Sequence, residues 1–175
     1  MTTQATHPDA RSATYEFFER AWQLKDADVL VEMAVPDCAY HVPDFPVMGN
    51  REFLEHLRHL WQAMPDLRVE LLDVITEGNE VACRARLLGT QTGDLHDVPP
   101  TGLKVDREEM TLLRWDGQGR LVSLHQEADN IEVLVQLGAM PSPEAGPMTF
   151  LTHAFTSAVH FTRLRRKARK ARTGQ

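Results

Sequence analysis

The sequence is poor in the residues from which disulfide frameworks, metal clusters and membrane spans are built. Its 175 residues include two cysteines, Cys38 and Cys83, without metal-ligand spacing, so we expect free thiols in a cytoplasmic protein. No apolar run approaches the ~20 residues of a membrane helix. The first ten residues lack the basic and apolar regions of a secretory signal. A glycine-rich phosphate loop, G-x-S-x-G and H-E-x-x-H are also missing, and we therefore expect no cofactor and no metal.

Positive charge is scarce everywhere except in one segment. The chain has 19 Lys and Arg against 25 Asp and Glu, and seven of the basic residues fall within residues 163–172. Such a tail can bind phosphates or anionic lipid, but a short cluster on an acidic body is more often a solvated helix end. We therefore expect neither a nucleic-acid partner nor a membrane partner.

Hydrophobic periodicity predicts helices first and then a series of strands, which is typical of an α+β fold. After a flexible leader (1–10), the expected domain spans 11–139. It is followed by a linker (140–147) and by a C-terminal helical extension with the basic tail (148–175). The predicted helices are 11–24, 27–33, 51–64 and 130–137, and the predicted strands are 38–42, 67–75, 81–90, 103–115 and 120–128. Residues 116–119, Asp-Gly-Gln-Gly, are a strong hairpin signal.

The strand at 120–128 contains the densest group of ionisable residues. With a period of two, one of its faces is polar and the other is mainly apolar. Periodicity alone places the polar face in solvent. The polar set is Ser123, His125, Glu127 and Asp129, and the other set is Val122, Leu124, Gln126 and Ala128.

Several short motifs, in a fixed order from Met48 to Gly138, together resemble the SnoaL-like polyketide cyclases. They include G-N-R-E-F-L-E-H-L, W-Q-A-M-P-D, G-T-Q-T-G, P-P-T-G, H-Q-E-A-D and Q-L-G. The family belongs to the fold group of ketosteroid isomerases and limonene epoxide hydrolases. The resemblance covers roughly residues 12 to 140. It implies a cone-shaped, curved antiparallel sheet wrapped by N-terminal helices around a pocket, with cofactor-free proton transfer as its usual chemistry and a homodimer as its usual assembly. The segment after Gly138, an extra C-terminal helix, is an addition that the resemblance does not explain.

The resemblance also implies catalytic residues. The family's acid/base aspartate matches Asp129. The resemblance therefore implies that the polar face of the strand 120–128 lines the pocket, whereas periodicity alone places that face in solvent. His125 stands where the family has Trp, and it adds a second titrating group. A carboxylate desolvated beside an apolar cavity can serve as a base near neutral pH.

Further residues are candidates for substrate binding. His41 matches a family histidine that precedes a proline-containing loop, although a hydrogen-bonded core histidine is an equal alternative. Gln91 replaces a family histidine and could orient a substrate oxygen. Glu108 and Glu109 point to opposite faces of the strand 103–115, so that Glu109 could enter the pocket and pair with Asp129. Tyr40 and Trp61 complete the set, although an apolar residue such as Trp61 is more often core.

These features predict a cofactor-independent cyclase or isomerase of a polyketide pathway. Asp129 removes a proton alpha to a carbonyl of a hydrophobic, polyketide-like substrate, and the enolate closes a ring by aldol attack. Two alternatives remain open. One is an epoxide hydrolase or hydroxylation partner on the same fold, with an arginine such as Arg84, Arg86 or Arg107. The other is a non-catalytic small-molecule-binding or dimerisation module.

Overall fold

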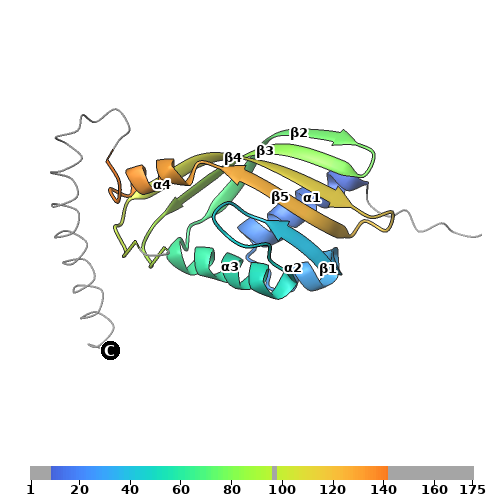
Figure 1. Ribbon diagram of the computed structural model, residues 1–175, viewed down its shortest axis with the longest axis horizontal. Helices are drawn as coiled ribbons and strands as arrows, with labels where there is room; N and C mark the ends of the chain where they lie inside the picture. Colours follow the sequence, from blue (N-terminus) through green and yellow to red (C-terminus); the bar gives the residue numbers. More distant parts are fainter. Residues whose placement is uncertain (1–8, 96–97, 142–175) are drawn as a thin grey trace, which may run out of the picture. The chain divides into compact units, whose positions relative to one another are not determined.

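The computed structural model describes residues 9–95 and 98–141 (Figure 1). The flexible leader apart from its last two residues, the linker after its first two residues, and the C-terminal helical extension lie outside the described residues. No helix of the described part is long and apolar enough to cross a membrane.

The order of elements confirms the α+β class: helical segments come first and are followed, after β1, by a helix and four strands (Figure 1). The elements are α1 (Ala10–Phe18), a π-helical segment η1 (Glu19–Gln23), α2 (Val29–Met33), β1 (Ala34–His41), α3 (Asn50–Ala63), β2 (Arg68–Glu77), β3 (Glu80–Thr90), β4 (Lys104–Trp115), β5 (Leu121–Ala128) and α4 (Asn130–Gln136).

The sheet has five strands in the order β1-β5-β4-β3-β2 and is mixed (Figure 1). Strand β5 pairs antiparallel with β4 but parallel with β1. The sequence predicted an antiparallel sheet, and β1 departs from it. Alternation reveals which face a residue is on but not the direction of a neighbouring strand, and α3, β2, β3 and β4 separate β1 from β5 along the chain.

Strand β1 also begins earlier than predicted, at Ala34 instead of Cys38. Pro36 is accommodated because β1 is an edge strand, where the missing N–H need not break a ladder. The register with β5 shifts between Ala34 and Ala39, the interval that contains the proline.

The described residues fall into two compact units. The first contains the chain up to Arg58, then Arg68–Leu87 and Glu108–Ala128. The second contains His59–Leu67, Leu88–Arg107 and the chain from Asp129.

In the first unit, helix α1 packs on the sheet through a buried polar anchor. The Trp115 indole N–H donates to Thr14 Oγ1 at 3.0 Å, and the Thr14 hydroxyl donates to the Ala10 carbonyl at 2.8 Å. Phe17 meets the Trp115 ring edge-to-face, with centroids 6.3 Å apart. All of these side chains are buried, so the hydrogen bonds satisfy polar atoms that would otherwise be desolvated without a partner.

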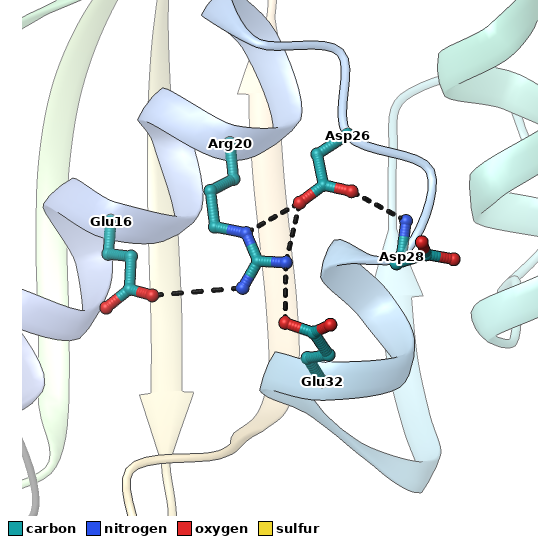
Figure 2. Close-up of polar contacts among 5 residues, drawn as sticks. All are labelled: Glu16, Arg20, Asp26, Asp28 and Glu32. Carbon is teal, nitrogen blue, oxygen red and sulfur yellow. Dashed lines mark hydrogen bonds and ion pairs between the residues drawn. The ribbon is translucent and has the colours of Figure 1, made fainter.

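Arg20 joins the helical segments that precede β1 (Figure 2). Its guanidinium donates to Asp26 Oδ2 and to Glu32 Oε2, each at 2.7 Å, and lies 3.8 Å from Glu16 Oε1. The hydrogen bonds that Arg20 donates to Asp26 and Glu32 raise the pKa of Arg20, and hydrogen bonds from the Asp28 backbone N–H and from Arg20 lower the pKa of Asp26. This network holds η1 and the start of α2 together.

Candidate functional site

The two faces of β5 have opposite environments. Leu124 and Gln126 are buried, whereas the side chains of His125 and Glu127 are 55% and 75% exposed. The period-two alternation alone therefore predicted correctly which face of β5 is buried and which is exposed. The expectation drawn from the resemblance, that the polar set faces inward, is wrong for His125 and Glu127, because the apolar residues of the alternate set are the ones that pack into the core.

His125 and His41 lie side by side across the parallel β1–β5 pair. They are register partners, and their rings stack with centroids 4.8 Å apart and planes inclined by 6°. His125 Nε2 also lies 3.5 Å from Glu127 Oε1. The structure thus brings together two of the predicted site residues, but on the exposed side of β5. Their roles in the reaction stay predictions.

Asp129 directly follows β5 and belongs to the second unit. It is exposed, and it is the N-cap of α4: its Oδ1 accepts hydrogen bonds from the backbone N–H groups of Ile131 at 2.9 Å and Glu132 at 3.1 Å. Capping of this kind satisfies donors that a helix leaves unpaired in its first turn. The geometry therefore gives Asp129 a structural task, and its role as a base stays a prediction.

The buried face of β4 and β5 carries a polar group of its own. Glu109, Thr111 and Gln126 are 3%, 3% and 8% exposed. Thr111 and Gln126 are direct cross-strand partners, and Gln126 Nε2 donates to Glu109 Oε2 at 2.7 Å. Glu108, the preceding residue, is exposed and forms an ion pair with Arg84 at 2.9 Å. The prediction that Glu108 and Glu109 occupy opposite faces is confirmed, and Glu109 is the inward one.

Sequence reasoning missed Gln126 and Thr111 as members of this group. A signal for both was present, because each is a polar residue at a position whose alternate neighbours along the strand include buried leucines, Leu124 and Leu113. Polar residues on an otherwise apolar face need a partner or a function. Only the register of β4 with β5 shows that Gln126 and Thr111 lie on the same face as Glu109.

Cys83 is also buried, and its thiol is unreactive. Its Sγ donates to the Thr111 carbonyl at 3.5 Å. Burial raises the pKa of the Cys83 thiol to about 12, and the charge of Glu109 acts in the same direction. The thiol is therefore neutral near pH 7 and offers no thiolate nucleophile.

Gln91, a predicted contact for a substrate oxygen, is used inside its own loop. The residue is fully buried. Its Nε2 donates to the carbonyls of Gly93, Val98 and Pro99 at 2.8, 3.1 and 3.1 Å, and its Oε1 accepts the Thr101 backbone N–H at 2.7 Å. These hydrogen bonds from the Gln91 amide hold together the parts of the loop that follows β3. Since both ends of the side chain are engaged there, we assign Gln91 to the structure of the loop.

Tyr40 is a core residue with a defined hydroxyl partner. It is fully buried, its ring stacks on Phe53 with centroids 4.0 Å apart, and its hydroxyl donates to Asn50 Oδ1 at 2.9 Å. Asn50 in turn donates to the Val35 carbonyl at 2.9 Å, so that the start of α3 is tied to β1. Burial raises the pKa of Tyr40, which therefore keeps its proton.

The remaining candidate, Trp61, lies on α3. Trp61 is half-buried in the part of α3 that belongs to the second unit. His56 contacts two rings, with centroids 4.8 Å from Phe45 and 6.2 Å from Phe53. Within residues 9–95 and 98–141, no three His, Cys, Asp or Glu side chains form a group suited to a metal ion.

The fold and its buried polar group define a class: a small α+β protein with a mixed sheet whose core-facing side carries the carboxylate of Glu109. The family model described as SnoaL-like polyketide cyclase matches residues 12–137. The chain therefore belongs to the SnoaL-like polyketide cyclase family.

Solved structures agree on the fold. A protein from Jannaschia sp. CCS1, provisionally described as a SnoaL-like polyketide cyclase, is 24% identical with a TM-score of 0.70, over 81% of this chain and 99% of that one. AclR from Streptomyces galilaeus, provisionally described as a hydroxylase, is 21% identical with a TM-score of 0.68, over 86% and 92%. IdmH from Streptomyces antibioticus, provisionally described as a polyketide cyclase, is 24% identical with a TM-score of 0.66, over 75% and 99%. The comparison with curated proteins gives no match.

Proposed function

We propose that this protein is a cofactor-independent cyclase or isomerase that acts on a hydrophobic, polyketide-like carbonyl compound. The observation that carries the proposal is a carboxylate, Glu109, on the buried face of the sheet in a chain of the SnoaL-like family. A positioned carboxylate can accept a proton from carbon as a general base. Family membership supplies the reaction class, and the buried acid supplies a group able to perform it.

The proposed cyclisation has three steps. A carboxylate takes the proton alpha to a carbonyl and leaves an enolate. The enolate carbon attacks a second carbonyl carbon of the same molecule and forms a C–C bond, and the resulting alkoxide recovers the proton from the carboxylic acid. Holding the two carbons in near-attack geometry supplies much of the acceleration for such an intramolecular step. An isomerase uses the first step and returns the proton to a different carbon.

Two carboxylates are candidates for the base. The resemblance points to Asp129, which is exposed and caps α4. The burial pattern points to Glu109, which is hydrogen-bonded to Gln126. In the proposal drawn from the resemblance, His125, His41 or Gln91 stabilises the enolate oxygen, although the two histidines stack on the exposed side of β5 and Gln91 is bonded within its own loop.

The proposal is tested by two readouts on one set of probes, aromatic polyketide methyl esters and aldehydes with an acidic CH between two carbonyls. Exchange of that proton in D2O, followed by NMR, reports proton abstraction, and mass-neutral conversion to a cyclic product reports ring closure. The wild type is expected to accelerate both. Binding without exchange would contradict the proposal and leave a binding module in its place.

An epoxide-opening or hydroxylating reaction is the rival within this fold. Such chemistry requires an arginine near paired carboxylates inside a pocket. Arg84 forms ion pairs with Asp73 and Glu108, but all three side chains are exposed on the surface. Incorporation of 18O from labelled water or O2 into the product separates this rival from a cyclase, whose product gains no oxygen. The homodimer predicted from the sequence stays a prediction, which light scattering in solution measures.

A further inference from the structure

In the part of the chain that the structure describes, the two edges of the sheet are β1 and β2 (Figure 1). An edge with open N–H and C=O groups can pair with a strand of another chain. The β1 edge is covered by the segment that follows it. Tyr40 and Met48 exchange backbone hydrogen bonds, each at 3.0 Å. The Asn50 side-chain amide donates to the Val35 carbonyl at 2.9 Å, so the continuation of the chain occupies this edge.

The β2 edge is covered instead by side chains from a distant part of the sequence. Gln23, the last residue of η1, precedes Val69 by 46 residues. Its Nε2 donates to the Val69 carbonyl, and its Oε1 accepts a hydrogen bond from the Val69 backbone N–H at 3.2 Å. Arg11 Nη1 donates to the Val74 carbonyl, farther along β2, at 2.8 Å. The Gln23 amide thus binds Val69 through one donor and one acceptor, as a residue of an added antiparallel strand would.

We propose that Gln23, assisted by Arg11, closes the β2 edge against the addition of a strand from a second copy of this chain. The strand has 10 residues and is rich in valine, leucine and isoleucine, and its Leu72 and Ile75 are 39% and 70% exposed. A long edge strand with exposed apolar side chains is prone to pair with another strand. Because a second copy carries the same edge, two β2 strands would pair across a twofold axis once the edge is open.

The π-helical segment brings Gln23 to the strand. Helix α1 ends at Phe18 and η1 follows directly, and the Leu24 backbone N–H donates to the Glu19 carbonyl, five residues back, at 2.9 Å. A π-turn holds one residue more than an α-helical turn, and it therefore changes which side chains face the neighbouring element. Segment η1 contacts β2, which is where the Gln23 amide binds. The rare turn thus has a specific task at this edge.

Light scattering over a range of protein concentrations tests the closure. Gln23→Leu keeps the approximate size of the side chain but neither donates nor accepts, so its mass should exceed that of the wild type by about twofold or more and should rise with concentration. Gln23→Lys also loses the paired amide, but its ammonium group can donate to the Val69 carbonyl and places a charge at the edge. Its mass should equal that of the wild type. Gln62→Leu, at an exposed position of α3, is the matched control for one added surface leucine and should also match the wild type.

Thermal unfolding of the same variants separates closure of the edge from a simple tether between η1 and β2. A tether predicts that Gln23→Leu and Gln23→Lys lose stability alike and associate alike. Equal association of the two variants would therefore overturn the inference, as would a folded Gln23→Leu variant with the mass of the wild type. Association of Gln62→Leu to the same extent as Gln23→Leu would also overturn it, because any exposed leucine would then suffice.

Hydrogen exchange locates the contact and does not depend on the folding of Gln23→Leu. The Val69 amide of the wild type is bonded to Gln23, so it should exchange about tenfold or more slowly than in Gln23→Lys, which offers no acceptor there. Equal exchange rates would overturn the inference. In an associated Gln23→Leu variant, the β2 amides should become more protected as concentration rises. Association without that protection would place the contact on another surface and overturn the inference as well.

Discussion

The buried and the exposed faces of β4 and β5 both carry polar side chains, but under different physical constraints. On the exposed face, His125 and Glu127 remain in contact with water, and their presence costs little. On the buried face, Glu109 and Gln126 are withdrawn from water and joined to each other at 2.7 Å. A polar residue on an exposed face needs no explanation, whereas the same residue on a buried face requires either a structural partner or a function.

The largest effect in stability should separate two adjacent leucines of β4. Leu113 is fully buried and Leu112 is 48% exposed. Leu113→Ala should lower the free energy of unfolding by about 2–5 kcal/mol, because it opens a cavity in the core. Leu112→Ala should change it by about 0.5 kcal/mol or less. Urea denaturation measures both, and equal losses would contradict the assignment of the two faces.

How well the faces follow from the sequence depends on the strand. In β4 and β5, regular alternation predicted the bounds within one residue, and it assigned Glu108 and Glu109 to the faces on which they lie. In β1, alternation could reveal neither the parallel direction nor the accommodation of Pro36, since both depend on where the strand joins the sheet.

The candidate site was predicted less completely than the fold. Glu109 was recognised as one of two possible inward residues, but the pairing with Gln126 depends on a cross-strand register that the sequence does not display. For the polar set of β5, the resemblance outweighed the periodicity, and the burial of Leu124 and Gln126 contradicts that choice. The role of Gln91 depends on carbonyls of Gly93, Val98 and Pro99 that converge only once the loop has folded.

An intermediate effect is expected at Asp129, where a structural task and a catalytic one predict different results. Asp129→Ala removes the acceptor for Ile131 and Glu132 and should lower the free energy of unfolding by about 1 kcal/mol. Asp129→Asn keeps a capping oxygen and should be close to neutral in stability. A stable Asp129→Asn variant without activity would identify Asp129 as the base, whereas a stable and active one would leave Glu109 as the candidate.

The smallest effect concerns the two thiols, which report whether water reaches the core. Burial raises the pKa of Cys38 to about 11 and that of Cys83 to about 12. The fold therefore favours the neutral thiols, so the stability they contribute is complete below the ordinary value of 9.0 and is lost as the pH rises from there toward 11 and 12.

A thiol-specific chromogenic reagent at pH 8 provides the measurement. The native protein should react slowly and the unfolded chain should release two equivalents, one for each cysteine of the sequence. Rapid reaction of Cys83 in the native state, seen by comparison with Cys38→Ser and Cys83→Ser variants, would mean that the face carrying Glu109 is open to solvent.

The most direct test of the central claim is a crystal structure of the Glu109→Gln variant with an unreacted polyketide-like probe bound. Our account predicts that the acidic carbon of the probe lies about 3–3.5 Å from the side chain at position 109, the separation of a near-attack geometry. It also predicts that the Gln126 amide remains bonded to that side chain. A probe whose acidic carbon lies against Asp129 or the His41–His125 pair, with position 109 still enclosed in the core, would contradict the account.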